Sequence, residues 1–146
     1  MLFGQYFYLV HGVVLWLCWG VFALVQIGSA RYLKGSYPKT YMTVHTVSGS
    51  LITGVTAFFS FYAQYGLNWK ILNNAHSYLA YPTLYGSVFV LCLGYMARFM
   101  LLNAKWNTRL ALTVTSLHRY LGHSVIVLGT FANSTGIYIY RNNTRN

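Results

Sequence analysis

The sequence predicts an all-α integral membrane protein in which four helices form an antiparallel bundle. Three observations lead to this fold class. The chain has 146 residues and is 56% hydrophobic and only 7% charged, whereas a soluble domain carries about 25% charged residues. Its basic residues separate four long uncharged runs, each longer than the roughly 20 residues that span a hydrocarbon core. The connections between runs are short, so consecutive helices are expected to be antiparallel.

The uncharged runs cover residues 2–30, 40–69, 71–97 and 110–140, and Arg119 alone interrupts the last of them. Within a single transmembrane domain, residues 1–146, they predict helices at about 5–30, 41–65, 75–100 and 110–138. A backbone embedded in lipid must satisfy its own hydrogen bonds, which favours helices. A β-barrel would need alternating segments of about ten residues, and the sequence does not show them.

The charged residues are ten Lys and Arg, with no Asp or Glu. This composition excludes a pair of carboxylates acting as general acid and base, and a hard-metal site built from acidic side chains. It also excludes the carboxylate proton relays of membrane pumps. The basic residues lie at the ends of apolar runs instead of forming a patch. The expected partners are therefore the lipid bilayer and an anionic lipid or cofactor, and no nucleic acid.

The distribution of basic residues predicts the orientation in the membrane. If the N-terminal side is called side A, that side carries Lys70, Arg141 and Arg145. Side B carries the other seven, which are Arg31, Lys34, Lys39, Arg98, Lys105, Arg109 and Arg119. The positive-inside rule places side B in the cytoplasm, or in the matrix of a mitochondrion. Both termini then face the lumenal or intermembrane side of a secretory-pathway or mitochondrial inner membrane.

Four histidines fall at two matching depths in the predicted helices. His11 in the first helix and His76 in the third lie near side A, and His45 in the second and His118 in the fourth lie near side B. In an up-down-up-down bundle the first and third helices are diagonal, as are the second and fourth. Two imidazoles that face each other across the core can fill both axial positions of a haem iron.

The sequence therefore offers two haem sites, about 20 Å apart along the bundle, which would form an electron path across the bilayer. The metal ligands would be His11 with His76 and His45 with His118. A lone histidine in a membrane helix is more often a hydrogen-bonded packing residue, so the prediction depends on the pairing. His123 lies about 140° around the helix from His118 and cannot bind the same iron. It is expected to pack near the ligands.

Two further features agree with haem binding. Haem propionates are anionic, and the nearby cations Arg31, Lys34, Lys39, Arg119 and Lys70 have no acidic side chains to pair with. Gly122, Gly129 and Gly136 recur every seven residues on roughly the face of His118. They could admit a flat macrocycle, or they could allow close contact between helices, which explains them equally well.

These motifs resemble the cytochrome b561 family, especially the form attached to DOMON domains. The resemblance covers nearly the whole chain: His11-Gly-Val-Val-Leu-Trp16 in the first helix, Tyr41-Met-Thr-Val-His45 in the second, His76-Ser77 in the third and His118-Arg-Tyr-Leu-Gly122 in the fourth. It implies two b-type haems and transmembrane electron transfer, commonly from ascorbate on the cytoplasmic side to ferric iron or monodehydroascorbate. By the same resemblance, Arg31 and Lys34 would lie near a donor site on side B.

The chain departs from the family in having only the four core helices, where members usually have five or six, and in lacking acidic residues. A reduced member is therefore expected, together with other membrane subunits, for example in a mitochondrial respiratory complex. One alternative is an accessory or structural subunit, with haem retained or lost. Another is the membrane anchor of a quinone reductase, which would need only one haem and would act on quinone instead of ascorbate. A transporter would need interrupted helices, which the sequence does not predict.

Overall fold

The computed structural model of the protein describes residues 2–66, 74–103 and 107–143. This part of the chain is all-helical, with short turns and no strand. Lys70, Lys105 and Arg145, which the orientation argument uses, lie outside the described residues.

The first helical segment is continuous from Leu2 to Ser36, although its winding changes along the way. It consists of α1 (Leu2–Trp16), a wider π-helical stretch η1 (Leu17–Phe22), α2 (Ala23–Gly28), a second π-helical stretch η2 (Ser29–Leu33) and α3 (Lys34–Ser36). It ends at Tyr37, whose φ of −135° and ψ of 67° are not helical. A residue before a proline is kept out of the helical region by contact with the proline ring, so Pro38 marks the end of this segment.

The other helical segments begin at a proline or after a capping asparagine. Helix α4 (Pro38–Phe61) has the proline in its first turn, where the missing N–H costs nothing, and continues as a π-helical stretch, η3 (Tyr62–Gly66). Helix α5 (Ala75–Leu102) follows Asn74, whose side chain accepts a hydrogen bond of 2.9 Å from the backbone N–H of Ser77. Helix α6 (Thr108–Asn143) follows Asn107, whose side chain accepts from the N–H of Arg109. Such caps satisfy donors that the first turn leaves free.

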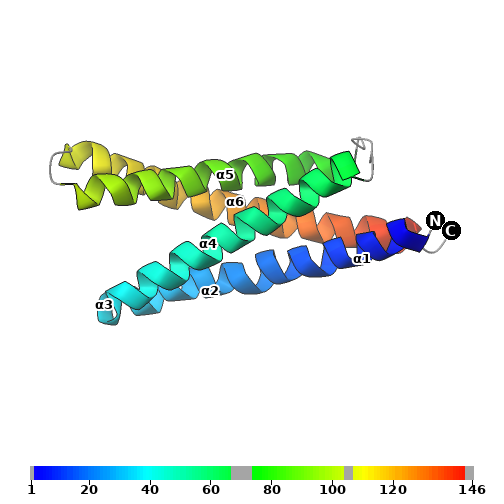
Figure 1. Ribbon diagram of the computed structural model, residues 1–146, viewed down its shortest axis with the longest axis horizontal. Helices are drawn as coiled ribbons and strands as arrows, with labels where there is room; N and C mark the ends of the chain where they lie inside the picture. Colours follow the sequence, from blue (N-terminus) through cyan, green and yellow to red (C-terminus); the bar gives the residue numbers. More distant parts are fainter. Residues whose placement is uncertain (1, 67–73, 104–106, 144–146) are drawn as a thin grey trace.

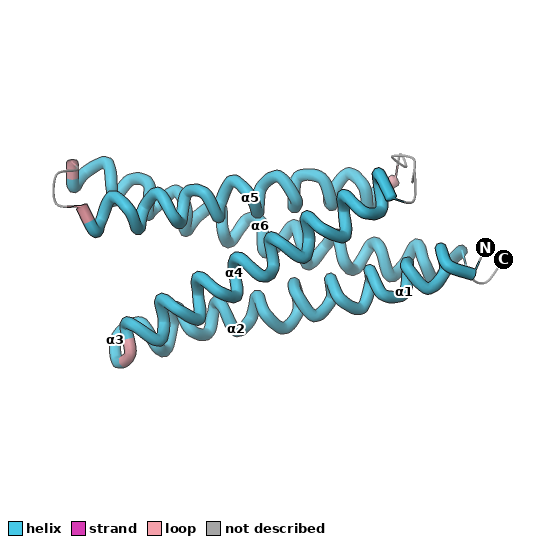
Figure 2. Tube along the Cα trace, in the orientation of Figure 1, coloured by secondary structure: helices cyan, strands magenta, loops and turns pink. Residues whose placement is uncertain are grey.

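The long helical segments lie side by side, and consecutive ones run in opposite directions (Figure 1). Helices α5 and α6 pack along most of their length, α2 packs on α4, α4 on α5, and α1 on α6. This order of neighbours places α1 opposite α5 and α4 opposite α6. The beginning of α1 and the end of α6 lie at one end of the molecule, and the α3 turn lies at the other (Figure 2).

Glycines allow close contact at these helix interfaces. A Cβ atom at Gly86 of α5 would lie 2.8 Å from Cγ2 of Val125 on α6. On α6, Gly129 is covered by the ring of Trp19, Gly136 lies against the ring of His76, and Gly122 is in contact with Val90. Because side chains of other helices occupy the space beside the three α6 glycines, close packing between helices is the better interpretation of their seven-residue spacing.

Within the described residues, three helical segments are long and apolar enough to cross a membrane: Tyr6–Ser36, Pro38–Tyr65 and Ala75–Leu102. Helix α6 is the longest, with 36 residues, but it is more polar and does not meet the same criterion. The described part of the chain is therefore all-helical and has the apolar helices of an integral membrane protein.

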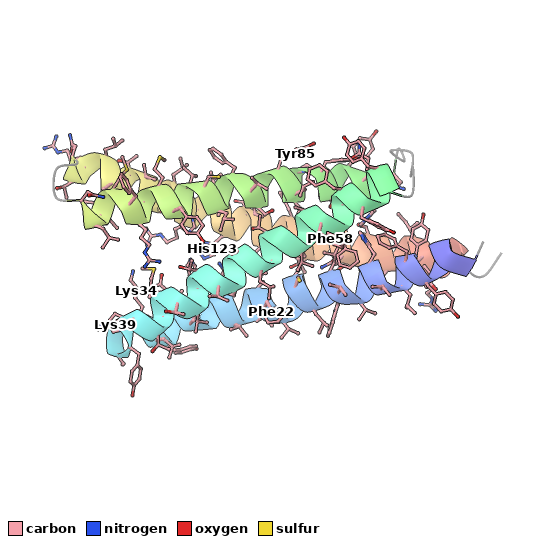
Figure 3. The ribbon with its side chains drawn as sticks, in the orientation of Figure 1. Phe22, Lys34, Lys39, Phe58, Tyr85 and His123 are labelled. Atoms are coloured by element: carbon pink, nitrogen blue, oxygen red, sulfur yellow. The ribbon has the colours of Figure 1, made fainter. Side chains whose placement is uncertain are left out.

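Many large apolar side chains are exposed on the outside of the molecule, and several small hydroxyl-bearing residues are buried inside it. Large hydrophobic side chains such as Phe22, Phe58 and Tyr85 project away from the helices (Figure 3). The buried polar residues are all small: Ser29, Ser48, Thr53, Thr56, Thr83 and Ser87. Small hydroxyl-bearing residues let helices approach closely where lipid removes the hydrophobic drive for association. This distribution suits a surface in contact with lipid.

Candidate functional site

The four histidines expected to bind iron form two facing pairs. The ring centres of His11 and His76 are 6.3 Å apart, and those of His45 and His118 are 6.0 Å apart. In each pair the two rings come from helices that face each other across the core, α1 with α5 and α4 with α6. The structure thus brings together the same residues that the sequence paired by depth.

Three helices give the same separation between the two pairs. Val90, whose carbonyl contacts His118, is fourteen residues after His76 on α5, and Ala132, whose carbonyl contacts His76, is fourteen residues after His118 on α6. On α4, Phe59 contacts the ring of His11 and is fourteen residues after His45. Fourteen residues of α-helix correspond to about 21 Å. The pairs therefore lie at two levels near opposite ends of the bundle.

One histidine of each pair is held by a hydrogen bond to the neighbouring helix. Nδ1 of His76 donates to the carbonyl oxygen of Ala132 at 2.9 Å, and Nδ1 of His118 donates to the carbonyl oxygen of Val90 at 2.9 Å. A carbonyl oxygen can only accept, so the proton is on Nδ1 and Nε2 carries the lone pair. Metal-binding histidines are commonly fixed in this way, because the second bond sets both the tautomer and the ring orientation.

A glycine lies beside each of these two rings, four residues after the accepting carbonyl. A Cβ atom at Gly136 would lie 3.0 Å from Nδ1 of His76, and one at Gly94 would lie 2.8 Å from Cε1 of His118. Any larger residue would push the ring away from its carbonyl. The two glycines therefore make the space in which the imidazoles are hydrogen-bonded.

The partner histidines lie among aromatic and amide side chains. The ring of His11 contacts Phe7 and Phe59, each with a centre-to-centre distance of 5.9 Å. The ring of His45 lies 5.5 Å from that of Tyr41, and the backbone carbonyl of His45 accepts a long hydrogen bond of 3.5 Å from the amide of Gln26. Nδ1 of His45 is buried, and no described residue bonds to it. A buried ring nitrogen of this kind suits a group that binds a ligand.

A narrow cavity of about 30 Å³ adjoins the His11–His76 pair. It is lined by both histidines, by Trp19 and by small or polar residues, among them Thr56, Ser60 and Gly129. The indole N–H of Trp19 donates to the hydroxyl of Thr56 at 3.1 Å. Trp19 is 5% exposed and forms the inner wall of this cavity, on the side facing the second pair.

The distance within each pair fits one metal ion between the rings. A metal lies about 2 Å from a coordinating imidazole nitrogen, and a ring with bonds of about 1.33 Å has its atoms about 1.1 Å from its centre. Two imidazoles on opposite sides of one ion therefore have their centres about 6 Å apart. An axial imidazole can rotate about its bond to the metal, so the interplanar angles of 78° and 76° are compatible with such a site.

The described residues supply two ligands at each level and no more. No group of three or more His, Cys, Asp or Glu side chains that could hold a metal occurs among them. A structural zinc site needs four such ligands. The two imidazoles at each level would hold the metal, and a haem would bring its other ligands with it. The donor set therefore fits haem.

Of the five cations named as possible haem contacts, Lys70 lies outside the described residues, and the other four lie at the surface on side B. Arg31 and Arg119 are exposed, and each guanidinium lies over the ring of the tyrosine that follows it, at 5.8 Å and 5.6 Å. Lys34 and Lys39 lie at the end of the molecule formed by the α3 turn (Figure 3). His123 is exposed, and its Nδ1 donates to the carbonyl of Arg119 on its own helix, so it is not part of either pair.

Sequence reasoning missed several residues of the site: Trp19, Gly94 and the carbonyls of Val90 and Ala132. One sequence signal could have found some of them. The pattern His-x-Tyr-Leu occurs at His76 and again 42 residues later at His118. The same offset relates Val90 to Ala132 and Gly94 to Gly136, so α5 and α6 hold each other's histidine in equivalent ways.

Comparison with protein-family models, curated proteins and solved structures found no match to this chain.

Proposed function

We propose that the chain carries electrons across a membrane through two b-type haems, one held by His11 and His76 and the other by His45 and His118. The observation that carries this proposal is the spacing within the pairs. Both have ring centres about 6 Å apart, a distance at which the two imidazoles would be able to hold one iron ion between them. Two such pairs at levels about 21 Å apart favour a path across the bilayer over a single structural site.

Each residue of the sites has a definite task in this proposal. His76 and His118 keep their protons on Nδ1 by bonding to carbonyls, which leaves Nε2 to bind iron. Gly136 and Gly94 leave room for these rings. Phe59 and Trp19 keep water away from the side A level. When bound, haem supplies one-electron exchange between ferric and ferrous iron, at a potential that axial ligands and burial set.

The membrane arrangement is part of the same proposal. We infer that α6 is a fourth crossing, because it packs along α5 for most of its length and places His118 at the level of His45. Side B would face the cytoplasm or the matrix, since the described cations Arg31, Lys34, Lys39, Arg98, Arg109 and Arg119 lie toward that side. Arg31, Lys34 and Arg119 would then be available to anionic haem propionates or to an anionic donor such as ascorbate.

A difference spectrum tests the proposal directly. The full chain, purified in detergent, should show the reduced-minus-oxidised bands of b-type haem, and a pyridine haemochrome assay should give two haems per chain. One haem would favour the membrane anchor of a quinone reductase. A protein that binds no haem when expressed with haem available would disprove electron transfer by this route.

A second function, as a subunit of a larger membrane complex, is favoured by the outer face of α6. There His123 and Ser124 are exposed in the middle of the helix, and the exposed Arg119 lies one turn before His123. Polar and ionisable groups in a membrane usually face protein instead of lipid. Replacing His123 and Ser124 with leucine should reduce the native size of the particle extracted from its own membrane. An unchanged size would exclude this face as a subunit contact.

A further inference from the structure

A second cavity opens on the lipid-facing surface, between the first helical segment and α6. It has a volume of about 110 Å³ and is lined mainly by Trp16, Trp19, Gly20, Thr130, Asn133 and Ser134. Trp16 is 51% exposed, and Thr130 and Ser134 are also exposed, so the cavity is a groove that can be entered from the bilayer. The volume is close to that of cavities that bind one aromatic ring, about 150 Å³.

The groove lies directly beside the His11–His76 level. Trp19 and Asn133 line both this groove and the cavity next to the two histidines. The side chain of Asn133 is fixed there, because its amide nitrogen donates to the carbonyl of Leu15 at 3.1 Å. A flat group in the groove would therefore share two wall residues, Trp19 and Asn133, with the cavity beside the histidines.

The polar groups around the groove include hydrogen-bond donors that a ligand with acceptor atoms could bind. The hydroxyls of Thr130 and Ser134 already donate to carbonyls one turn earlier on α6. No described residue accepts from the indole N–H of Trp16, and this nitrogen lies at the Gly20 side of the groove, 3.7 Å from where a Cβ of Gly20 would be. An indole N–H in an apolar setting usually finds an acceptor. One N–H of the Asn133 amide is also not used by Leu15.

The depth of the groove in the bilayer indicates which hydrogen-bond acceptors of a membrane could reach it. Trp16 is five residues from Val21, the middle of the 31-residue span Tyr6–Ser36, which places it about 7.5 Å from the bilayer centre. The ester carbonyls of phospholipids lie at the edge of the hydrocarbon core, about 15 Å from the centre. A quinone is a flat ring with two carbonyl acceptors and an apolar tail, and it is soluble at this depth.

We propose that the groove between Trp16, Gly20 and α6 binds the ring of a membrane quinone. The Trp16 indole N–H and the Asn133 amide donate to its carbonyl oxygens, and its tail extends into the lipid. The choice of a redox-active ring rests on the proposed haem function of the neighbouring His11–His76 pair. The observation of a ring-sized groove with hydrogen-bond donors does not depend on the proposed haem function.

Photolabelling tests the proposal. The full chain is placed in phosphatidylcholine nanodiscs and illuminated with an azido-substituted benzoquinone that carries a short alkyl tail, and labelled peptides are mapped by mass spectrometry. We expect label on Trp16–Gly20 and on residues 130–137, with loss of label when an unlabelled alkyl quinone competes. Label spread over all lipid-facing helices would overturn the proposal, as would equal competition by cholesterol.

Matched glycine variants make the test specific. Gly20→Leu places a side chain in the groove, where the atoms nearest to an added Cβ belong to the Trp16 ring and lie at ordinary contact distance, and should weaken labelling about tenfold or more. Gly54→Leu is the control, because Gly54 is exposed on α4 with nothing within 4 Å of its added Cβ. It should change labelling by less than about twofold. Trp16→Phe keeps the ring but removes the N–H and should weaken labelling about two- to tenfold.

The absorbance spectrum of the same nanodiscs, recorded before illumination, separates this proposal from the previous one. Two haems together with diffuse labelling would disprove quinone binding in the groove and support the haem sites. Localised labelling in a protein that binds no haem would disprove electron transfer through haem and support quinone binding in the groove. Equal loss of labelling in Gly20→Leu and Gly54→Leu would count against the groove in either case.

Discussion

Replacing His45 with alanine should remove one haem and leave the other. The variant lacks one imidazole of the side B pair, whereas the His11–His76 pair lies about 21 Å away along the helices. Substitutions that are more than about 7–10 Å apart and share no partners usually act independently. His118 keeps its hydrogen bond to the carbonyl of Val90, so the α5–α6 packing should survive. We expect the haem content to fall from two per chain to one.

The assay is the pyridine haemochrome of the purified variant, measured together with its reduced-minus-oxidised spectrum. The amplitude of the difference bands should fall by about half, since one of two similar ligand sets is removed. His123→Ala is the matched control, because this imidazole is exposed and bonds only within α6 in the described structure, and it should keep both haems. Loss of both haems in His45→Ala, or of neither, would refute the assignment of ligands.

Three further predictions follow from the packing. Gly136→Ala should reduce haem at the His11–His76 level alone and Gly94→Ala at the His45–His118 level alone, because each added methyl lies within about 3 Å of one histidine ring. Spectra in a background lacking the other pair would check this, and equal effects on both levels would contradict it. Thr56→Val should lower the free energy of unfolding by about 1–3 kcal/mol, since the buried indole N–H of Trp19 loses its acceptor. The hydroxyl of Thr83 bonds only to the carbonyl of Leu79 on its own helix, so Thr83→Val should lower the free energy of unfolding by less. Chemical denaturation of both variants in detergent measures this difference. Gly129→Leu should destabilise the fold by about 1–3 kcal/mol or more by displacing the Trp19 ring, whereas a thermal midpoint equal to that of the unaltered protein would show that the ring moves freely.

The arrangement of long helices was predictable because few physical constraints determine it. Charged residues end apolar runs, lipid requires helices, and short connections require antiparallel neighbours. These constraints also placed His11 with His76 and His45 with His118, since depth in a helix follows directly from residue number. The apolar criterion fits three helical segments. For α6 the prediction of a crossing stays a proposal, because Thr, Ser, His and Arg residues reduce its apolar character.

The details of the sites could not be derived from depth and pattern. The π-helical stretch at Leu17–Phe22 changes which face of the first segment turns inward, and it contains Trp19. A uniform α-helical period does not predict such a change. The carbonyls of Val90 and Ala132 are backbone groups with no sequence signature of their own. For Arg31 and Lys34 the sequence showed the charge and the side of the membrane. It could not predict what these side chains contact, because long flexible side chains at a surface are not fixed by their position in the sequence.

The reciprocal bonds between α5 and α6 have a consequence for how the protein assembles. Each of the two helices carries one histidine and the backbone carbonyl that accepts from the histidine of the other helix. The two hydrogen bonds therefore join α5 and α6 at two places along the hairpin and fix its register. A slip of one residue between these helices would break both together. The α5–α6 hairpin therefore carries one histidine of each pair in a position fixed by hydrogen bonds that involve neither of the two earlier helical segments. An insertion of one residue between His76 and Val90 makes their spacing on α5 differ from that of His118 and Ala132 on α6, so both bonds cannot form together and one of the two levels should be lost.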